Sequence, residues 1–158
     1  MATTAGKSTQ QQQTTPASPA AVTHLHGSCS CGRNQYVVSI PLEQREYAAV
    51  YFDNGSDGRL TNGAPITAFL RIPLTWYSSS TYAYTPQESP SSIRRVFAPH
   101  DANPYARRTF CGYCGTPLTY WTEQPDGEGG FMSVTVGSLR GRDQEKRARR
   151  RWSRGCAR

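Results

Sequence analysis

The sequence predicts a mainly β domain built from antiparallel strands. Short runs rich in Val, Ile, Thr, Tyr and Phe alternate with Gly, Pro, Asn and Ser, a pattern typical of strands and turns. None of these runs sustains the i, i+3, i+4, i+7 spacing of an amphipathic helix. Two tight cysteine pairs that lie far apart in the chain could fasten such a domain.

Residues 1–23 are predicted to be disordered. They are mostly Thr, Gln, Ala, Ser and Pro, with one Lys and no acidic or aromatic residue. A segment of this composition cannot bury enough apolar surface to offset its ordering entropy. It also has neither the apolar core of a secretory signal nor the Arg-rich pattern of a mitochondrial transit peptide. An intracellular, cytoplasmic location is therefore expected.

The ordered domain is expected to span residues 24–139. Strict alternation over Asn34–Ile40 predicts a strand that buries Tyr36, Val38 and Ile40 on one face. The segment 53–58 mixes two acidic residues with Asn, Gly and Ser, which favours a turn over a site for a hard cation. Six further runs are expected to form strands: 47–52, 66–72, 82–84, 93–97, 118–121 and 131–136.

Residues 140–158 form a predicted basic tail. They carry nine basic and two acidic residues, which equals the net charge of +7 of the whole chain. The tail predicts non-specific binding to an acidic partner or polyanion, although it contains no recognisable nucleic-acid-binding motif. It is either a native extension or an altered chain end. No apolar run approaches the roughly 18 residues of a membrane span, so no membrane role is expected.

Four cysteines form the strongest chemical signal in the chain. Glycines lie within or just after each pair, where they allow the backbone to turn its N–H groups toward the sulfurs. Tetrahedral zinc takes four such soft ligands. The spacing predicts one structural zinc ion held by Cys29, Cys31, Cys111 and Cys114. Free thiols or disulfides are the alternative, but two cysteines two positions apart in a strand are poorly placed for a disulfide.

The remaining histidines and the fifth cysteine are expected to stay outside the metal site. His24 and His26 precede the first cysteine pair, but four thiolates already complete one zinc site. His100 lies in a predicted surface loop. Cys156 stands among arginines, which lower a thiol pKa, but it has no partner in sequence for catalysis.

The flanks of the cysteine pairs resemble a known family. The segments Gly27–Gly32 (GSCSCG), Arg108–Trp121 (RTFCGYCGTPLTYW) and Val136–Leu139 (VGSL) follow the motif order of the glutathione-dependent formaldehyde-activating enzyme family, which includes centromere protein V (GFA/CENP-V). The resemblance implies a compact β-tent fold and a structural zinc on the four cysteines. It also implies carbon–sulfur lyase activity that joins glutathione and formaldehyde into S-hydroxymethylglutathione at a second zinc.

The segment that would hold this second zinc departs from the family pattern. The family uses a central Cys-x-Cys-x-x-Cys, whose incompletely ligated zinc can bind a thiol and polarise a carbonyl. Residues 51–60 contain no cysteine, and the three ligand positions fall near Asp53, Gly55 and Gly58. A second, catalytic ion is therefore not expected, and no catalytic residue is carried over.

Two functions follow from these observations. The first is a carbon–sulfur lyase, or a relative with an altered substrate, that binds glutathione or a related thiol adduct. The second is a non-catalytic, zinc-stabilised binding module with a basic tail for an acidic partner. Aromatic and basic residues could line a glutathione-sized cleft, or could instead be core and solvated surface. These residues are Arg59, Arg71, Trp76, Tyr77, Tyr120 and Trp121.

Overall fold

The computed structural model describes residues 21–98, 104–124 and 126–141, and strands dominate these ranges. The strands are β1 (Val22–Ser28), β2 (Asn34–Pro41), β3 (Ala49–Asp53), β4 (Thr67–Pro73), β5 (Tyr77–Thr81), β6 (Arg94–Phe97), β7 (Ala106–Cys111), β8 (Pro117–Thr122) and β9 (Phe131–Thr135). The α-helices are α1 (Ser56–Asn62) and α2 (Pro90–Ile93). Short 3₁₀ helices are η1 (Leu42–Tyr47), η2 (Leu74–Trp76), η3 (Glu128–Gly130) and η4 (Val136–Ser138).

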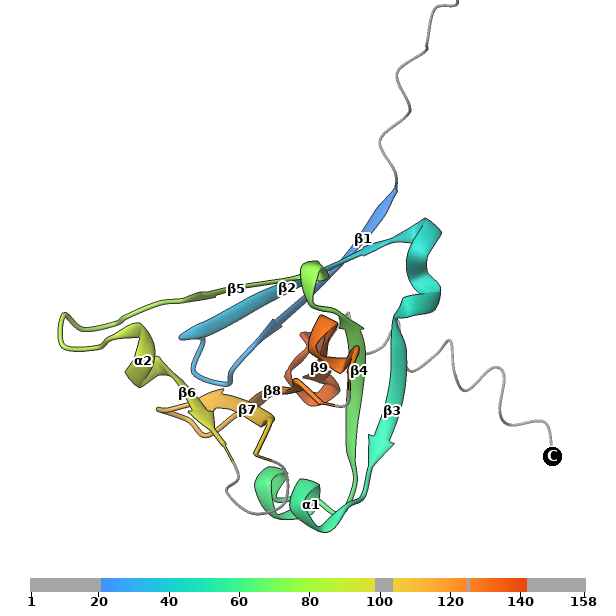
Figure 1. The fold of residues 1–158 in the computed structure, drawn as a ribbon. Coiled ribbons are helices and arrows are strands. Elements are labelled where there is room, and N and C mark those ends of the chain that lie inside the picture. The colour runs from blue at the N-terminus through green and yellow to red at the C-terminus, as the bar shows by residue number, and fades with distance from the viewer. Residues whose placement is uncertain (1–20, 99–103, 125, 142–158) are drawn as a thin grey trace, which may run out of the picture.

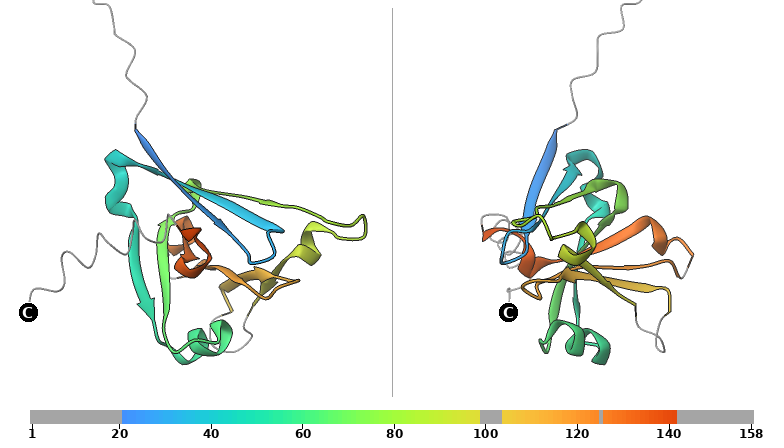
Figure 2. Two further views of the ribbon diagram at one scale, coloured as in Figure 1. Left: turned by 180° about the vertical axis from the view of Figure 1, so that it is seen from behind. Right: turned by 90° about the vertical axis from the view of Figure 1, so that its left-hand side faces the viewer.

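The strands form two antiparallel sheets. The smaller sheet has the order β1-β2-β5, and the larger has the order β3-β4-β9-β8-β7-β6. In Figure 1 the small sheet runs along the top, β3 and β4 descend on the right, and β6, β7 and β8 lie below, so that the strands enclose a roughly triangular section. The view from behind shows the same arrangement (Figure 2). The predicted mainly β, antiparallel class is confirmed.

The hydrophobic core fills the space between the sheets. Tyr36, Val38 and Ile40 alternate inward along β2, as the sequence predicts, and are at most 3% exposed. Leu70 and Ile72 of β4 are fully buried in the same cluster. Its other large buried members are Leu25, Trp76, Leu118, Val134 and Leu139. Two of the four clustered cysteines, Cys29 and Cys111, belong to this core as well.

One predicted strand is wrong, and three observed strands, β1, β5 and β7, were not predicted. Residues 82–84 lie beyond the end of β5, and Tyr82 and Tyr84 are exposed. The strand is the preceding serine-rich segment β5, because its backbone pairs with β2 from Tyr77 to Thr81. Strands β1 and β7 lack an alternating apolar pattern in sequence, yet β1 pairs with β2 along its whole length and β7 pairs with β6 on one side and β8 on the other.

The acidic segment after β3 forms the predicted turn and then continues as a helix. The N–H of Gly55 donates to the Asp53 carboxylate at 2.9 Å, which makes the turn. Helix α1 follows directly and ends at Gly63, whose φ of 62° is the left-handed conformation that glycine adopts readily. The prediction of a turn alone therefore missed one short helix.

Several sequence predictions fall on residues outside the described ranges. These predictions concern residues 1–20, His100, most of the basic tail (142–158) and Cys156. At the near boundary, β1 begins at Val22, two residues inside the segment predicted to be disordered. Among the described residues, no helix has the length and apolar character needed to cross a lipid bilayer.

Candidate metal centre

Two hairpin turns carry the four cysteines. The β1–β2 turn holds Cys29 and Cys31, and the β7–β8 turn holds Cys114 and begins at Cys111, the last residue of β7. In the first turn, the Gly32 N–H donates to the Cys29 carbonyl at 3.1 Å. In the second, the Gly115 N–H donates to the Cys111 carbonyl at 2.9 Å. Each turn therefore presents two sulfurs to the same space.

The two glycines that close these turns have positive φ angles. The φ of Gly32 is 80° and that of Gly115 is 71°. Side chains with a Cβ are strained in this region, whereas glycine is not. The glycines seen beside the cysteine pairs in the sequence thus have the conformational role expected of them.

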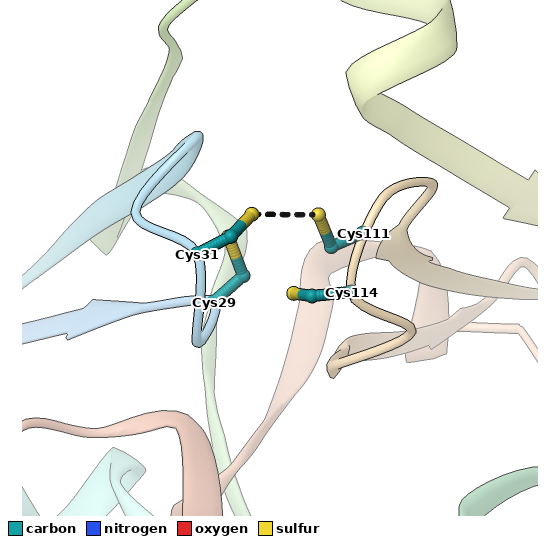
Figure 3. Close-up of side chains that lie close together, drawn as sticks. All are labelled: Cys29, Cys31, Cys111 and Cys114. Carbon is teal, nitrogen blue, oxygen red and sulfur yellow. Dashed lines mark hydrogen bonds between the residues drawn. The ribbon is translucent and has the colours of Figure 1, made fainter.

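The four sulfurs meet in one cluster, with all Sγ atoms within 4.8 Å of one another. The Sγ atoms of Cys29 and Cys31 are 3.5 Å apart, and those of Cys31 and Cys111 are 3.6 Å apart (Figure 3). Metal–sulfur bonds of about 2.3 Å in a tetrahedron place sulfurs about 3.8 Å apart. A disulfide would need about 2.05 Å, so these cysteines are free thiols. The structure therefore positions all four to bind a metal ion.

The cluster lies at the edge of the core and between the two sheets. Cys29 is 2% exposed and Cys111 is fully buried, whereas Cys114 is exposed at the surface. On the buried side, the Asn34 N–H donates to the Cys29 sulfur at 3.2 Å, and the Asn34 side-chain amide donates to the same sulfur at 3.8 Å. An N–H group that donates to a sulfur stabilises the thiolate form that a metal requires.

Burial and hydrogen bonding affect the thiols differently. Burial raises the pKa of Cys111 to about 12. At Cys114 burial also opposes ionisation, but hydrogen bonds from the hydroxyl and N–H of Thr116 outweigh it and lower the pKa to about 6. At Cys31 burial is likewise outweighed, by hydrogen bonds from Arg33, and the pKa is lowered. A divalent ion requires thiolates, so metal binding releases protons and weakens as pH falls.

A second layer of polar contacts holds the two turns against each other. The Ser30 N–H donates to the Thr116 hydroxyl at 3.1 Å, and the same hydroxyl lies 3.2 Å from the Cys114 sulfur. The Ile93 carbonyl accepts from the Asn34 side chain at 3.1 Å and from the Gly112 N–H at 2.9 Å. The Cβ of any larger residue at position 112 would overlap the Ser92 carbonyl oxygen.

An arginine beside the first cysteine pair clamps a third segment to the centre. Arg33 donates two hydrogen bonds to the Glu88 carboxylate, at 2.8 and 3.0 Å. Its guanidinium carbon lies 4.2 Å from the ring centroid of Tyr84 and 4.3 Å from that of Tyr113. Tyr113 belongs to the second cysteine turn, so this cation–π contact joins the two turns and the loop after β5.

Sequence reasoning identified the four cysteines but missed this supporting shell. Asn34, Arg33 and Thr116 each lie within three positions of a cysteine, so nearness in sequence was a usable signal for them. Glu88 lies 55 positions from the arginine it pairs with and had no such signal. His24, which was expected to stay outside the site, is absent from the cluster and its Nδ1 lies 3.1 Å from the Ser39 hydroxyl.

The central segment does not fit the second zinc that the family resemblance implies. At position 58 a Cβ would overlap the carboxylate of Asp53, and Asp57 is paired with Arg108 at 2.7 Å. In the described part of the chain, the four cysteines are the only cluster of three or more metal-binding side chains. Residues 53–58 therefore supply neither the thiolates nor a free set of carboxylates for a catalytic ion.

The residues proposed to line a glutathione cleft are dispersed. None of the six lines the pocket beside α1 or the pocket beside β1, β2 and β5. Trp76 is 9% exposed and packs in the core. Arg71 pairs with Glu128 at 2.8 Å, and its guanidinium stacks 3.5 Å from the centroid of the Phe131 ring. The contacts of Trp76 therefore fit a core residue, and those of Arg71 fit a structural surface residue, better than they fit the wall of a glutathione cleft.

The fold and the cluster define the class of protein: a mainly β domain with four cysteines positioned to bind a metal ion. No protein-family model and no curated protein matches the sequence. The fold is similar to that in a structural-genomics crystal structure of a Rhodobacter sphaeroides protein, with a TM-score of 0.51 and 18% sequence identity. The match covers 73% of this chain and 88% of that one. At this identity the similarity shows a shared fold alone.

Proposed function

We propose that the chain is a zinc-stabilised binding module with one structural ion. The carrying observation is the cluster of Cys29, Cys31, Cys111 and Cys114, with every sulfur within 4.8 Å of the others. Four thiolates in a tetrahedral arrangement suit zinc or iron. Zinc is favoured because it needs no redox partner and is the usual ion of two cysteine turns facing each other. Reduced thiolates of this kind fit a cytoplasmic location.

A structural role is proposed because the four cysteines complete the coordination of the ion. A catalytic zinc keeps one position open for water or substrate, whereas a four-thiolate site has none. The ion would join the turn of the small sheet to a turn of the large sheet. Structural zinc can supply about 10–16 kcal/mol of apparent binding free energy, compared with a net stability of about 5–15 kcal/mol for an ordinary domain.

We further infer that the chain is a divergent relative of the GFA/CENP-V family. The support is the ordered set of motifs at 27–32, 108–121 and 136–139, together with the mainly β fold. The lyase reaction with glutathione and formaldehyde is the less favoured alternative, because residues 53–58 do not fit the second zinc.

Elemental analysis of the purified full chain tests the zinc site. We expect one zinc and no iron per chain, and a loss of zinc in Cys31→Ser and Cys114→Ser. Cys156→Ser is the matched control, because it removes a cysteine outside the cluster, and it should retain the ion. Full zinc retention in both cluster variants would disprove the proposed ligand set. Two zinc ions per chain, or turnover of glutathione with formaldehyde, would instead favour the lyase.

The concentration of charge in the C-terminal tail supports a second, independent proposal. Residues 140–158 hold the entire net charge of +7. We propose that this tail binds polyanions without sequence specificity, with affinity that falls steeply as salt increases. Deletion of 142–158 leaves Arg140, whose N–H donates to the His26 carbonyl at 2.8 Å, in place. The deletion should abolish binding to heparin or duplex DNA. Undiminished binding would show that the tail is not the segment that binds polyanions.

A further inference from the structure

A pocket of about 430 Å³ lies beside α1, and Gly115, which closes the second cysteine turn, also lines it. Residues of α1, β4, β6, β7, β8 and β9 line it. Three phenylalanines and a proline supply most of the apolar wall: Phe69, Phe97, Phe110 and Pro117. This volume is within the range of pockets that hold small organic molecules, about 300–1,000 Å³.

The floor of the pocket is fixed by an aromatic cluster. Phe69 is 2% exposed and stacks on Tyr51, with ring centroids 5.5 Å apart and an interplanar angle of 22°. The Tyr120 ring packs against Phe69 at a centroid distance of 6.4 Å. The Tyr51 hydroxyl is held by Ser133 at 3.0 Å. Such a floor needs little rearrangement to accept a flat ligand, which lowers the cost of binding.

The hydroxyl groups that line the pocket are already satisfied by the protein. Thr109 and Thr119 share a hydrogen bond between their hydroxyls. The Thr135 hydroxyl lies 2.7 Å from the Pro117 carbonyl, to which it donates. These groups therefore place few demands on a ligand, and the apolar wall dominates recognition.

The charge at the pocket is balanced. Arg108 is 13% exposed, donates to the Asp57 carboxylate at 2.7 Å and lies 4.7 Å from the centroid of the Tyr120 ring. A paired guanidinium offers an anion much less than a free one does. The Nε–H of the same arginine is buried and has no hydrogen-bond partner among the residues that the structure describes. A buried donor left in this state costs about 1–3 kcal/mol, which a ligand acceptor can recover.

We propose that this pocket binds an uncharged aromatic small molecule that carries one hydrogen-bond acceptor, such as an aryl ketone or aldehyde. The ring would lie on Phe69 and against Phe97, and the acceptor would take the Arg108 Nε–H after a small rotation of that side chain. The proposal identifies a ligand for a binding module, but it does not depend on which ion the cysteines hold.

Titration of the zinc-loaded full chain with Prodan, an uncharged naphthyl ketone whose emission shifts to the blue on burial, tests the pocket. We expect saturable binding of one molecule per chain. Phe97→Ala should weaken it about tenfold, since the variant removes an exposed aromatic wall worth about 1.4 kcal/mol. Phe52→Ala is the matched control, because Phe52 is also an exposed strand phenylalanine but does not line the pocket.

Competition against bound Prodan tests the ligand class. We expect 2-acetylnaphthalene to compete better than 2-ethylnaphthalene, which lacks the acceptor, and better than the anion 2-naphthoate. Arg108→Lys keeps the charge but removes Nε, so it should reduce the preference for the ketone over the ethyl compound. Zinc content, measured for each variant, separates a pocket defect from loss of the metal centre. Absence of saturable binding, equal effects of the two phenylalanine variants, or stronger competition by naphthoate would overturn the proposal.

Discussion

Asn34 shows how one side chain can support a metal centre without being a ligand. It is 1% exposed, and its amide donates to the Ile93 carbonyl at 3.1 Å. Its carbonyl oxygen accepts from the Arg94 Nε at 3.2 Å, and its own backbone N–H donates to the Cys29 sulfur. A buried amide that uses both ends in this way is expensive to remove, because several partners lose their hydrogen bonds together.

We predict that Asn34→Ala lowers the free energy of unfolding by about 2–4 kcal/mol, from a small cavity and the unsatisfied buried groups it leaves. Urea unfolding of the zinc-loaded protein would measure this. Gln35→Ala is the neighbouring control, because its side chain makes one long hydrogen bond of 3.3 Å to the Gly32 carbonyl, and it should cost under about 1 kcal/mol. Equal effects of the two variants would contradict a special role for Asn34.

The hydrogen bonds of Glu88 should make the stability of the protein depend on pH. The hydrogen bonds from Arg33, and then that from the Tyr84 N–H, lower the pKa of this carboxyl to about 2. In the unfolded chain a glutamate has a pKa of about 4.3. The folded state therefore favours the carboxylate, and the resulting stabilisation is complete above pH 4.3 and is lost as the pH falls toward 2.

We accordingly expect the ¹³C shift of the Glu88 carboxyl to stay at its ionised value when the pH is lowered from 7 to 4.5. The stability difference between the wild type and Glu88→Gln should be constant from pH 7 to about 5.5 and shrink only below about 4.3. A titration midpoint near pH 4.3 for the Glu88 carboxyl in the folded protein would contradict the stabilising contact between Arg33 and Glu88.

At the scale of elements, the sequence predicts a strand well where one face is buried and poorly where pairing alone holds it. Strand β2 alternates because Tyr36, Val38 and Ile40 face the core. Strand β5 (YSSST) also alternates between half-buried and exposed positions, but two of its three half-buried residues are Ser79 and Thr81, so the sequence shows no apolar alternation. It is a strand because its backbone pairs with β2. Strand β7 carries two arginines, and Arg108 is used to pair with Asp57 rather than to face water. These pairings depend on segments far away in sequence.

The residues of the metal centre likewise fall into those that the sequence predicts and those that it does not. Its ligands could be predicted, because the short spacing within each cysteine pair is a local property of the chain. The Arg33–Glu88 clamp and the contact of Asn34 with Ile93 could not, because they join residues 55 and 59 positions apart. The pocket beside α1 was missed for the same reason, since its wall combines residues from six elements.

The pairing of β1 with β2 leaves no space for a side chain at Gly27. This residue lies opposite Tyr36, and the Tyr36 ring occupies the space that a Cβ on Gly27 would need. The ring cannot move freely, because its hydroxyl is held by Ser138 at 2.6 Å. We predict that Gly27→Ala destabilises the protein by about 1–3 kcal/mol through overpacking. Gly130→Ala, which adds a methyl group where no atom lies within 4 Å, is the thermal-unfolding control and should be close to neutral.

At the scale of the whole molecule, the cysteine cluster is one of the places where side chains from both sheets meet, as they also do where Arg94 of β6 donates to Asn34 of β2 and Ser79 of β5. One cysteine pair belongs to the β1–β2 turn of the small sheet and the other to the β7–β8 turn of the large sheet. Elsewhere the sheets are linked by packing in the core and by single contacts such as the bridge between Gly27 and Leu139. An ion held by all four thiolates would therefore stabilise the association of the sheets more than either sheet alone.

We predict that removal of the ion abolishes cooperative unfolding of the domain. The expected loss of about 10–16 kcal/mol is comparable to the net stability of an ordinary domain, about 5–15 kcal/mol. Near-ultraviolet circular dichroism should lose its aromatic signal when a chelator is added, because Tyr36, Trp76 and Tyr77 pack between the sheets. Addition of excess zinc should restore both the signal and the melting transition. A metal-free chain that melts as sharply, and at the same temperature, as the zinc-loaded chain would show that core packing alone holds the two sheets together.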